Sequence, residues 1–162
     1  MIKIFDNYLS VKEKEEIYNF CKLQGYYRGE QDFPGAKPTG LVAPLSNQYI
    51  IKKLTQPINI ENQIIVKAYI NLFLPSEKPY YHIDNSSSDY KTCIYYVNTE
   101  NVNYINEEGE TYFIDGNFKK GVSFSPGRMI LFNANITHKA TSFRSLDRYT
   151  IAIKFKNDKG KE

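Results

Sequence analysis

The chain of 162 residues is long enough for one domain with its own hydrophobic core, and its length argues against a second domain. Its content of 41% hydrophobic and 24% charged residues is typical of globular proteins and excludes a disordered or membrane class. The 21 basic and 18 acidic side chains are spread along the sequence, so the net charge of +3 indicates a solvated surface and no nucleic-acid partner.

The cysteines and the N-terminal residues bear on the compartment. Residues 1–10 contain no apolar run long enough for a signal peptide, and no stretch of the sequence approaches a membrane span. Cys21 and Cys93 lie in segments that read as a helix and a buried strand, which indicates free thiols and no disulfide framework. We therefore expect a reduced, cytoplasmic protein with no membrane partner.

The first sixty residues predict mainly helices and loops. Residues 2–5 predict a short strand, and Ser10 with Glu13 forms the S-x-x-E capping box that opens a helix reaching about Leu23.

A long loop and a second helix are expected next. Residues 28–45 are rich in Gly and Pro and lack periodicity, so they predict a long loop of the kind that often binds ligands. A short helix should follow from Ser46 to about Leu54.

From residue 63 onward the pattern changes to strands. Short segments rich in β-branched and aromatic residues are separated by turns, at residues 63–73, 91–98, 110–115, 123–133 and 148–155. Helices followed by strands indicate an α+β, mainly β, fold with antiparallel sheets, for which a jelly roll backed by the N-terminal helices is the natural architecture. We expect a single domain over 1–162, with a helical part to about residue 60 and a jelly-roll core over about 61–156.

The last predicted strand has two different faces, because residues two apart in a strand point to the same side. One face is apolar and suits a core: Tyr149, Ile151, Ile153 and Phe155. The other would suit the wall of a site for a small anion: Arg148, Thr150, Ala152 and Lys154.

Two more strands divide in the same way. In residues 63–73, one side carries the apolar residues Ile64, Val66, Ala68, Ile70 and Leu72, and the other carries Tyr69 and Asn71. In the following strand Thr92, Ile94 and Tyr96 share a face. These patterns predict a small barrel with a partly polar cavity, although a two-sheet sandwich with one solvated face would also fit them.

The two histidines of the chain point to metal chemistry. His82 and Asp84 form an H-x-D pair whose spacing on a strand aims both side chains at one point, and His138 follows a later strand. Two imidazoles and one carboxylate on one face of an octahedron form the facial triad of non-haem Fe(II) oxygenases. Each residue taken singly could instead have a surface or capping role.

Arg148 comes ten residues after His138, on the predicted cavity face. Its guanidinium can hold a carboxylate through two parallel hydrogen bonds, which lysine cannot do, and Thr150 could add a hydroxyl. The conjunction predicts a site for Fe(II) and a dicarboxylate co-substrate, 2-oxoglutarate.

A family resemblance is carried by four segments, which read YYHIDNSSSDYKTCIYYVN, EEGETYFID, FSPGRMILFNANITHKATSF and RYTIAIKF. Together they resemble the 2-oxoglutarate- and Fe(II)-dependent oxygenase superfamily, in particular its prolyl-4-hydroxylase-like branch, over about residues 63–156. The chain looks like a compact bacterial or phage-type member. The resemblance implies a double-stranded β-helix fold.

The resemblance also implies roles for individual residues. His82, Asp84 and His138 would bind Fe(II), and Arg148 would bind the C5 carboxylate of 2-oxoglutarate. Further co-substrate contacts would be Tyr96 and Tyr69, although both tyrosines could be core residues instead. The strand faces described above add Thr150 and Asn71 as candidate contacts. The implied reaction consumes O₂, converts 2-oxoglutarate to succinate and CO₂, and hydroxylates a peptidyl (first of all prolyl) or small-molecule substrate.

Two features bear on the reaction and the substrate. Halogenating relatives lack the carboxylate that Asp84 provides, so its presence favours hydroxylation. The usual G-G-E-T of the family is here Glu108-Gly109-Glu110-Thr111, beside the substrate mouth of relatives. Residues 28–45 and 98–109 are candidate substrate-binding segments by position.

Two other function classes remain open. A jelly-roll binding module with incidental histidines would leave Arg148 without a partner. A zinc hydrolase would use the same three ligands with water as the fourth, but it has no use for Arg148 and no separate general base is visible.

Overall fold

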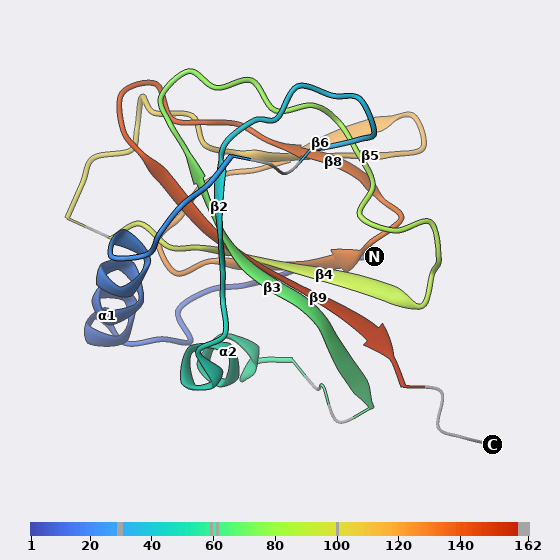
Figure 1. Ribbon diagram of the computed structural model, residues 1–162, viewed down its shortest axis with the longest axis horizontal. Helices are drawn as coiled ribbons and strands as arrows, with labels where there is room; N and C mark the ends of the chain where they lie inside the picture. Colours follow the sequence, from blue (N-terminus) through green and yellow to red (C-terminus); the bar gives the residue numbers. More distant parts are fainter. Residues whose placement is uncertain (29–30, 59, 61, 100, 159–162) are drawn as a thin grey trace.

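The computed structural model describes residues 1–28, 31–58, 60, 62–99 and 101–158, which fold into two helices and two antiparallel sheets (Figure 1). The helices are α1 (Val11–Lys22) and α2 (Gln48–Thr55). The strands are β1 (Ile2–Phe5), β2 (Leu41–Pro44), β3 (Gln63–Phe73), β4 (Tyr90–Tyr96), β5 (Thr111–Asp115), β6 (Phe118–Val122), β7 (Met129–Asn133), β8 (Thr137–Ala140) and β9 (Arg148–Asn157).

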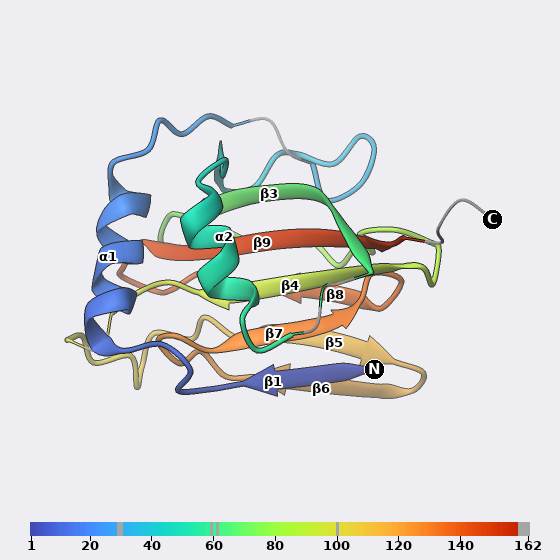
Figure 2. The same ribbon diagram turned by 90° about the horizontal axis from the view of Figure 1, so that it is seen from below.

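The two sheets differ in size and face each other. Six strands form the larger sheet in the order β1-β7-β4-β9-β3-β2, and three form the smaller one in the order β6-β5-β8. Both helices cover one face of the larger sheet, and the smaller sheet lies on the opposite side (Figures 1 and 2). The predicted jelly-roll architecture with supporting helices is confirmed.

Helix α1 begins where the sequence predicts, whereas α2 begins at Gln48, two residues after the predicted Ser46, and both helices complete the larger core. Ser10 caps α1 in a full capping box with Glu13, and Asn47 caps α2 by accepting a hydrogen bond from the amide of Ile50. The apolar faces of the two helices pack on the larger sheet, where Ile17 and Leu54 are almost fully buried. Within the described residues, no helix combines the length and apolar character needed to cross a membrane.

Strand β9 has the two faces that its alternation predicts. Its residues Tyr149, Ile151, Ile153 and Phe155 all belong to the core beneath the helices. Its other face points between the two sheets, toward a cavity described below. Because β9 is paired with β3 on one side and β4 on the other, both of these neighbours contribute side chains to the same cavity.

The apolar face predicted for the β3 segment is wrong at its beginning. Ile64 and Val66 are 51% and 52% exposed, whereas Ile65 packs against the core. The pairing with β9 shifts between Ile65 and Lys67, which marks a β-bulge. An extra residue in a strand reverses the alternation on one side of it, so the single period assumed for the whole segment fails there.

Three strands lie where no strand was predicted. Residues 41–44 of the predicted loop form the edge strand β2, and residues 29–30 of that loop lie outside the described part of the chain. Pro44 is tolerated because it ends a strand at the sheet edge, where its missing amide costs no ladder bond. β6 and β8 are short and largely polar, so their sequences show no apolar alternation.

Candidate active site

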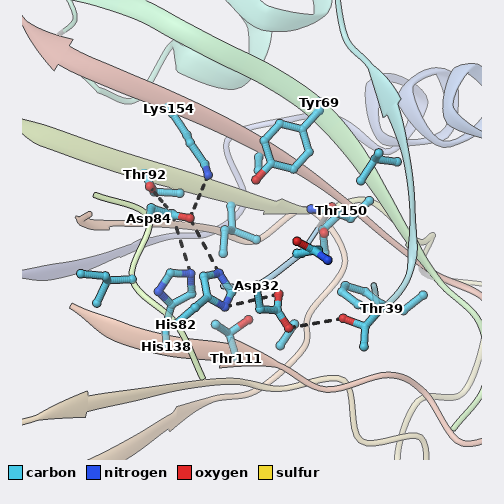
Figure 3. A pocket seen from close by; sticks show the side chains of 18 of the residues that line it. Asp32, Thr39, Tyr69, His82, Asp84, Thr92, Thr111, His138, Thr150 and Lys154 are labelled. Atoms are coloured by element: carbon cyan, nitrogen blue, oxygen red, sulfur yellow. Dashed lines mark hydrogen bonds and ion pairs between the residues drawn. The ribbon is translucent and has the colours of Figure 1, made fainter. Parts of the chain in front are cut away.

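A cavity of about 600 Å³ lies between the two sheets (Figure 3). The larger sheet contributes the polar faces of β3, β4 and β9, and the smaller sheet contributes Thr111, His138 and Ala140. Residues 31–34 of the segment before β2 also line it. The cavity is therefore enclosed by strands of both sheets and by part of the predicted 28–45 loop.

His82 and His138 are brought together by direct backbone pairing. The amide of His82 donates to the carbonyl of His138 at 3.0 Å, and the amide of His138 donates to the carbonyl of His82 at 2.9 Å. The two rings lie 4.5 Å apart, centre to centre. One isolated β-bridge thus joins residues 56 positions apart in the sequence and sets both side chains on the same wall.

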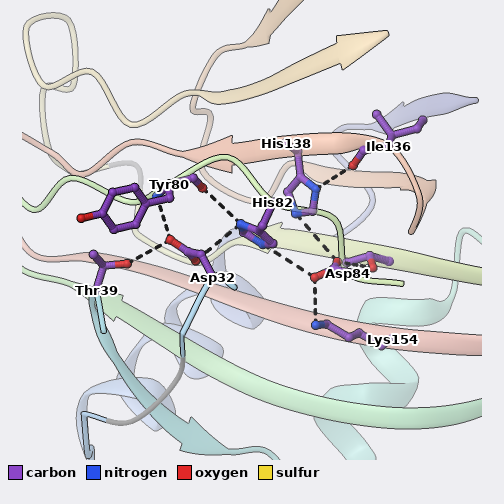
Figure 4. Close-up of polar contacts among 9 residues, drawn as sticks. Asp32, Thr39, Tyr80, His82, Asp84, Ile136, His138 and Lys154 are labelled. Atoms are coloured by element: carbon purple, nitrogen blue, oxygen red, sulfur yellow. Dashed lines mark hydrogen bonds and ion pairs between the residues drawn. The ribbon is translucent and has the colours of Figure 1, made fainter. Parts of the chain in front are cut away.

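Hydrogen bonds orient both imidazole rings (Figure 4). Nδ1 of His82 lies 3.2 Å from the carbonyl oxygen of Tyr80, and Nδ1 of His138 lies 3.0 Å from that of Ile136. A carbonyl can only accept, so each Nδ1 must be the donor, which leaves Nε2 as the nitrogen that can bind a metal ion. Both Nε2 atoms lie 3.8 Å from a carboxylate oxygen of Asp84.

The Asp84 carboxylate is held on both oxygens. Thr92 donates its hydroxyl to Oδ2 at 2.5 Å, and the ammonium of Lys154 lies 2.9 Å from Oδ1. Burial acts to raise the pKa of Asp84, but the attractions of His138 and Lys154 and the Thr92 hydrogen bond outweigh it and lower that pKa. Asp84 is therefore an anion at neutral pH.

The three residues fit a divalent metal ion. Their ligand atoms all lie within 4.8 Å of one another. Burial lowers the pKa of His138, which keeps that imidazole neutral and able to coordinate. Two imidazoles and one carboxylate form the ligand set of the facial triad, and the backbone carbonyls supply the outer hydrogen bonds that metal-bound histidines usually make. The structure thus brings His82, Asp84 and His138 together, as the sequence predicts.

Arg148 lines the same cavity as a buried cation that forms no ion pair with any described residue. Its side chain is fully buried, and its Nε donates to the carbonyl of Gly109 at 3.1 Å. Its two terminal nitrogens have no hydrogen-bond partner among the described residues. Burial lowers its pKa, though an arginine stays charged in proteins. Such an arrangement is costly unless an anion completes it, and a carboxylate would match both free nitrogens.

Tyr96 occupies a different place from the other predicted co-substrate contacts. It does not line the cavity among the described residues, and its hydroxyl donates to Thr111 Oγ1 at 2.8 Å. Its ring lies 5.2 Å from the guanidinium carbon of Arg148, and the ring of Phe73 lies 5.9 Å from it. In this structure Tyr96 supports the guanidinium from within the protein.

The remaining predicted contacts face the cavity. Tyr69, Asn71 and Thr150 all line it, from β3 and β9. The described residues of the segment 98–109, which exclude residue 100, do not line it. That segment acts on the site indirectly, through the Gly109 carbonyl that accepts from Arg148.

The departure from G-G-E-T has a backbone consequence. Glu108 stands at the position of the first glycine with φ 65°, a left-handed conformation that glycine adopts more easily. Its carboxylate is paired with Arg144 at 2.7 Å. The turn that presents Gly109 to Arg148 is thus kept despite the substitution.

Asp32 is a site residue that sequence reasoning missed. Its Oδ2 accepts hydrogen bonds from the amide of Tyr80 at 2.7 Å and from the hydroxyl of Thr39 at 3.3 Å. Its Oδ1 lies 3.4 Å from Nδ1 of His82 (Figure 4). A carboxylate on the outer nitrogen of a metal-binding histidine fixes the orientation of the ring. No local pattern marks Asp32, because its partner lies 50 residues further along the chain.

Comparisons with known proteins were made by sequence and by structure. No protein-family model and no curated protein sequence matches the chain. Solved structures do match it along nearly its whole length.

One similar structure is a prolyl hydroxylase from Trichoplax adhaerens in complex with a hypoxia-inducible factor peptide, with 19% identity and a TM-score of 0.71, covering 98% of this chain and 84% of that one. Another is a Pseudomonas putida prolyl-4-hydroxylase, with 10% identity and a TM-score of 0.71 over 96% and 92% of the two chains. HygX from Streptomyces hygroscopicus, with nickel and 2-oxoglutarate bound, is 14% identical with a TM-score of 0.71 over 99% and 84%. At these identities the likeness establishes the fold, and the chain has the double-stranded β-helix fold of 2-oxoglutarate- and Fe(II)-dependent oxygenases.

Proposed function

We propose that the chain is a 2-oxoglutarate- and Fe(II)-dependent oxygenase. The observation that carries the proposal is the pairing of two features in one cavity: the His82, Asp84 and His138 cluster, and the buried guanidinium of Arg148 with two free nitrogens. A dicarboxylate that chelates the metal ion with one end would bind the guanidinium with the other, so one molecule would engage both features. The similarity of fold to HygX, which was solved with nickel and 2-oxoglutarate bound, supports this co-substrate.

Each residue then has a defined task. Nε2 of His82, Nε2 of His138 and one oxygen of Asp84 would hold Fe(II), and the chemistry that bound iron supplies is O₂ activation with conversion of 2-oxoglutarate to succinate and CO₂. Arg148 would fix the far carboxylate of the co-substrate through two parallel hydrogen bonds.

The walls of the cavity would orient the co-substrate and limit its contact with water. Thr150, Asn71 and Tyr69 line the space on the side of the larger sheet and offer polar groups. Phe33 and Pro34, from the segment before β2, line the same cavity with apolar surface. Exclusion of water strengthens every electrostatic contact within such a site.

Hydroxylation is the reaction that we propose, because Asp84 provides the carboxylate that a halogenase lacks. The substrate would be a prolyl-type peptide or a small molecule. Two structural neighbours carry these two kinds of ligand, a hypoxia-inducible factor peptide and hygromycin B. Other neighbours are an epimerase and a carbocyclase, so the fold alone does not fix the reaction.

The two other function classes fit the structure less well. A zinc hydrolase using the three ligands leaves the free nitrogens of Arg148 without a purpose. A binding module without metal leaves the gathering of two imidazoles around Asp84 unexplained. We also propose one domain over residues 1–162 and a cytoplasmic location, which the two buried free thiols of Cys21 and Cys93 support.

The experiment is anaerobic addition of Fe(II) and 2-oxoglutarate, followed by O₂. We expect a visible charge-transfer band on anaerobic mixing and succinate after O₂ is admitted. His82→Ala should abolish the band, and Arg148→Lys should weaken 2-oxoglutarate binding at least about tenfold, since one charged hydrogen bond is lost.

Arg128 provides a matched control, since its guanidinium is paired with Asp6 outside the cavity. Arg128→Lys should leave the affinity for 2-oxoglutarate as in the unmodified protein. If His82→Ala and Arg148→Lys both retain the band at unchanged 2-oxoglutarate concentrations, the assignment is wrong.

A further inference from the structure

Lys154 is a second cation on the wall of the cavity, distinct from Arg148. It lies on β9 with its ammonium 2.9 Å from Asp84 Oδ1 and 5.4 Å from the ring centre of Tyr69. Its side chain is 23% exposed, whereas Arg148 is fully buried. Among the described lining residues, these two carry the permanent positive charges.

Lys154 is badly placed to bind the far carboxylate of 2-oxoglutarate. It lies six residues after Arg148 on the same face of the strand, so the two backbone positions are roughly 20 Å apart. Arg148 already offers two free nitrogens for that carboxylate. Lys154 instead stands beside the metal-binding end of the site, next to Asp84.

The charges of the loaded site leave Lys154 without a full partner. A divalent ion, Asp84, the two carboxylates of 2-oxoglutarate and Arg148 together sum to zero, and Asp32, whose charge would balance Lys154, forms no ion pair with it among the described residues. A bound metal ion would also weaken the ion pair between Lys154 and Asp84, because the Asp84 carboxylate would then be shared between two positive charges. Lys154 has a flexible four-carbon stem and can turn its ammonium toward the open part of the cavity.

Asp32 is the second carboxylate among the described residues that line the cavity, and its contacts are with groups other than Lys154. It accepts from the Tyr80 amide and the Thr39 hydroxyl and faces Nδ1 of His82. No ion pair joins it to Lys154 in the described part of the chain. The cavity volume of about 600 Å³ lies within the range that holds drug-sized ligands, so a small second molecule fits beside the co-substrate.

We propose that Lys154 binds an anionic group of the primary substrate, which is therefore an acid with a carboxylate or phosphate close to the carbon that reacts. The inference rests on the proposed function, because it assumes that the metal and 2-oxoglutarate occupy the site. It makes Lys154 the residue that selects between charged and neutral substrates.

The test uses simple anions as probes of the loaded site. The protein is mixed anaerobically with Fe(II) and saturating 2-oxoglutarate, and sodium acetate, inorganic phosphate or acetamide is added at constant ionic strength. The charge-transfer band reports binding next to the metal. We expect acetate or phosphate to shift the band at millimolar concentration, and the isosteric but neutral acetamide to bind at least about tenfold more weakly, because it lacks the charge. The stronger of the two anions indicates which acid the site prefers.

Three variants assign the effect to Lys154. Lys154→Gln should weaken the stronger anion at least about tenfold, whereas Lys154→Arg should stay within about threefold of the unmodified protein, because it keeps the charge. Lys156→Gln is the matched control, since this exposed lysine lies two residues further along β9, outside the cavity lining. Its anion binding should not change.

The outcomes separate this inference from the proposed function. If the unmodified protein gives no charge-transfer band, both are overturned. If the band forms but neither anion shifts it, or if Lys154→Gln binds the anions as tightly as the unmodified protein, the inference alone fails. A loss of 2-oxoglutarate affinity in Lys154→Gln as large as the loss of anion affinity would assign Lys154 to the co-substrate and would also overturn it.

Discussion

Replacing Arg148 with methionine should remove co-substrate binding and yet leave the ligand-free protein at least as stable. Arg148 is a fully buried charge whose terminal nitrogens have no partner among the described residues. A buried ion without a counter-ion opposes folding, whereas an apolar side chain of similar length does not. A binding site of this kind exchanges stability for function.

The expected change in the free energy of unfolding follows from the contacts of the Arg148 guanidinium. Desolvation of a buried ion costs several kcal/mol, here taken as about 5 kcal/mol, which the methionine variant avoids. It would lose the Nε hydrogen bond to Gly109, worth about 2 kcal/mol, and the contacts with the rings of Phe73 and Tyr96, worth about 2 kcal/mol together. The balance predicts that Arg148→Met raises the free energy of unfolding by about 1 kcal/mol.

The assay is urea unfolding without metal or 2-oxoglutarate, combined with calorimetric titration of 2-oxoglutarate into the Mn(II)-loaded protein. Arg128→Met is the control, because Arg128 is paired with Asp6 at 2.8 Å and 3.0 Å and should cost about 1 kcal/mol when removed. If Arg148→Met destabilises the ligand-free protein by several kcal/mol, the guanidinium is satisfied within the fold, and the reasoning that it awaits an anion is refuted.

Three further predictions follow from the contacts around the site. Asp32→Ala should weaken Co(II) binding about tenfold to a hundredfold, measured against a chelating dye, because the carboxylate that lies 3.4 Å from Nδ1 of His82 and helps to orient the ring is lost. Equal affinity in Asp32→Ala and in the surface control Asp115→Ala would contradict this. Gly109→Ala should lower the free energy of unfolding, measured in urea, by about 2–5 kcal/mol, because Gly109 has a φ of 89° and a methyl group there overlaps a neighbouring aromatic ring. A decrease below about 1 kcal/mol would refute this prediction. Burial lowers the pKa of His138, so between that pKa and about 6.5 the unfolded chain binds a proton that the folded chain does not, and the metal-free protein should lose stability as pH falls through this window. In urea unfolding from about pH 7 to about pH 5, the free energy of unfolding of His138→Gln should depend less steeply on pH than that of the unmodified protein. An equally steep dependence would count against the prediction.

The sequence was most informative where side chains alternate over a long strand. β9 shows both of its predicted faces, because both of its neighbours hold it in register along its length. The same rule failed at the start of β3, where a bulge near Val66 shifts the pairing, and a bulge leaves no mark in the pattern of apolar residues. Short polar strands such as β8 escaped prediction because their pairing partners determine them more than their own sequence does.

The residues of the candidate site likewise fall into those that a local sequence pattern predicts and those that it does not. The H-x-D spacing and the strand that carries Arg148 are local patterns, and they indicated residues that the structure brings to one cavity. Asp32 reaches His82 only through the folded path of an irregular segment, which has no periodicity to interpret. The place of Tyr96 depends on the direction of its hydroxyl toward Thr111 on the other sheet, a contact between elements that no single segment encodes.

The most direct measurement is a crystal structure of the protein with Mn(II) and 2-oxoglutarate, with anomalous data collected at the manganese edge. We expect one anomalous peak bonded to His82, Asp84 and His138, and the C5 carboxylate of 2-oxoglutarate in contact with both terminal nitrogens of Arg148. An anomalous peak elsewhere, or a co-substrate whose far carboxylate is turned away from Arg148, would contradict the account.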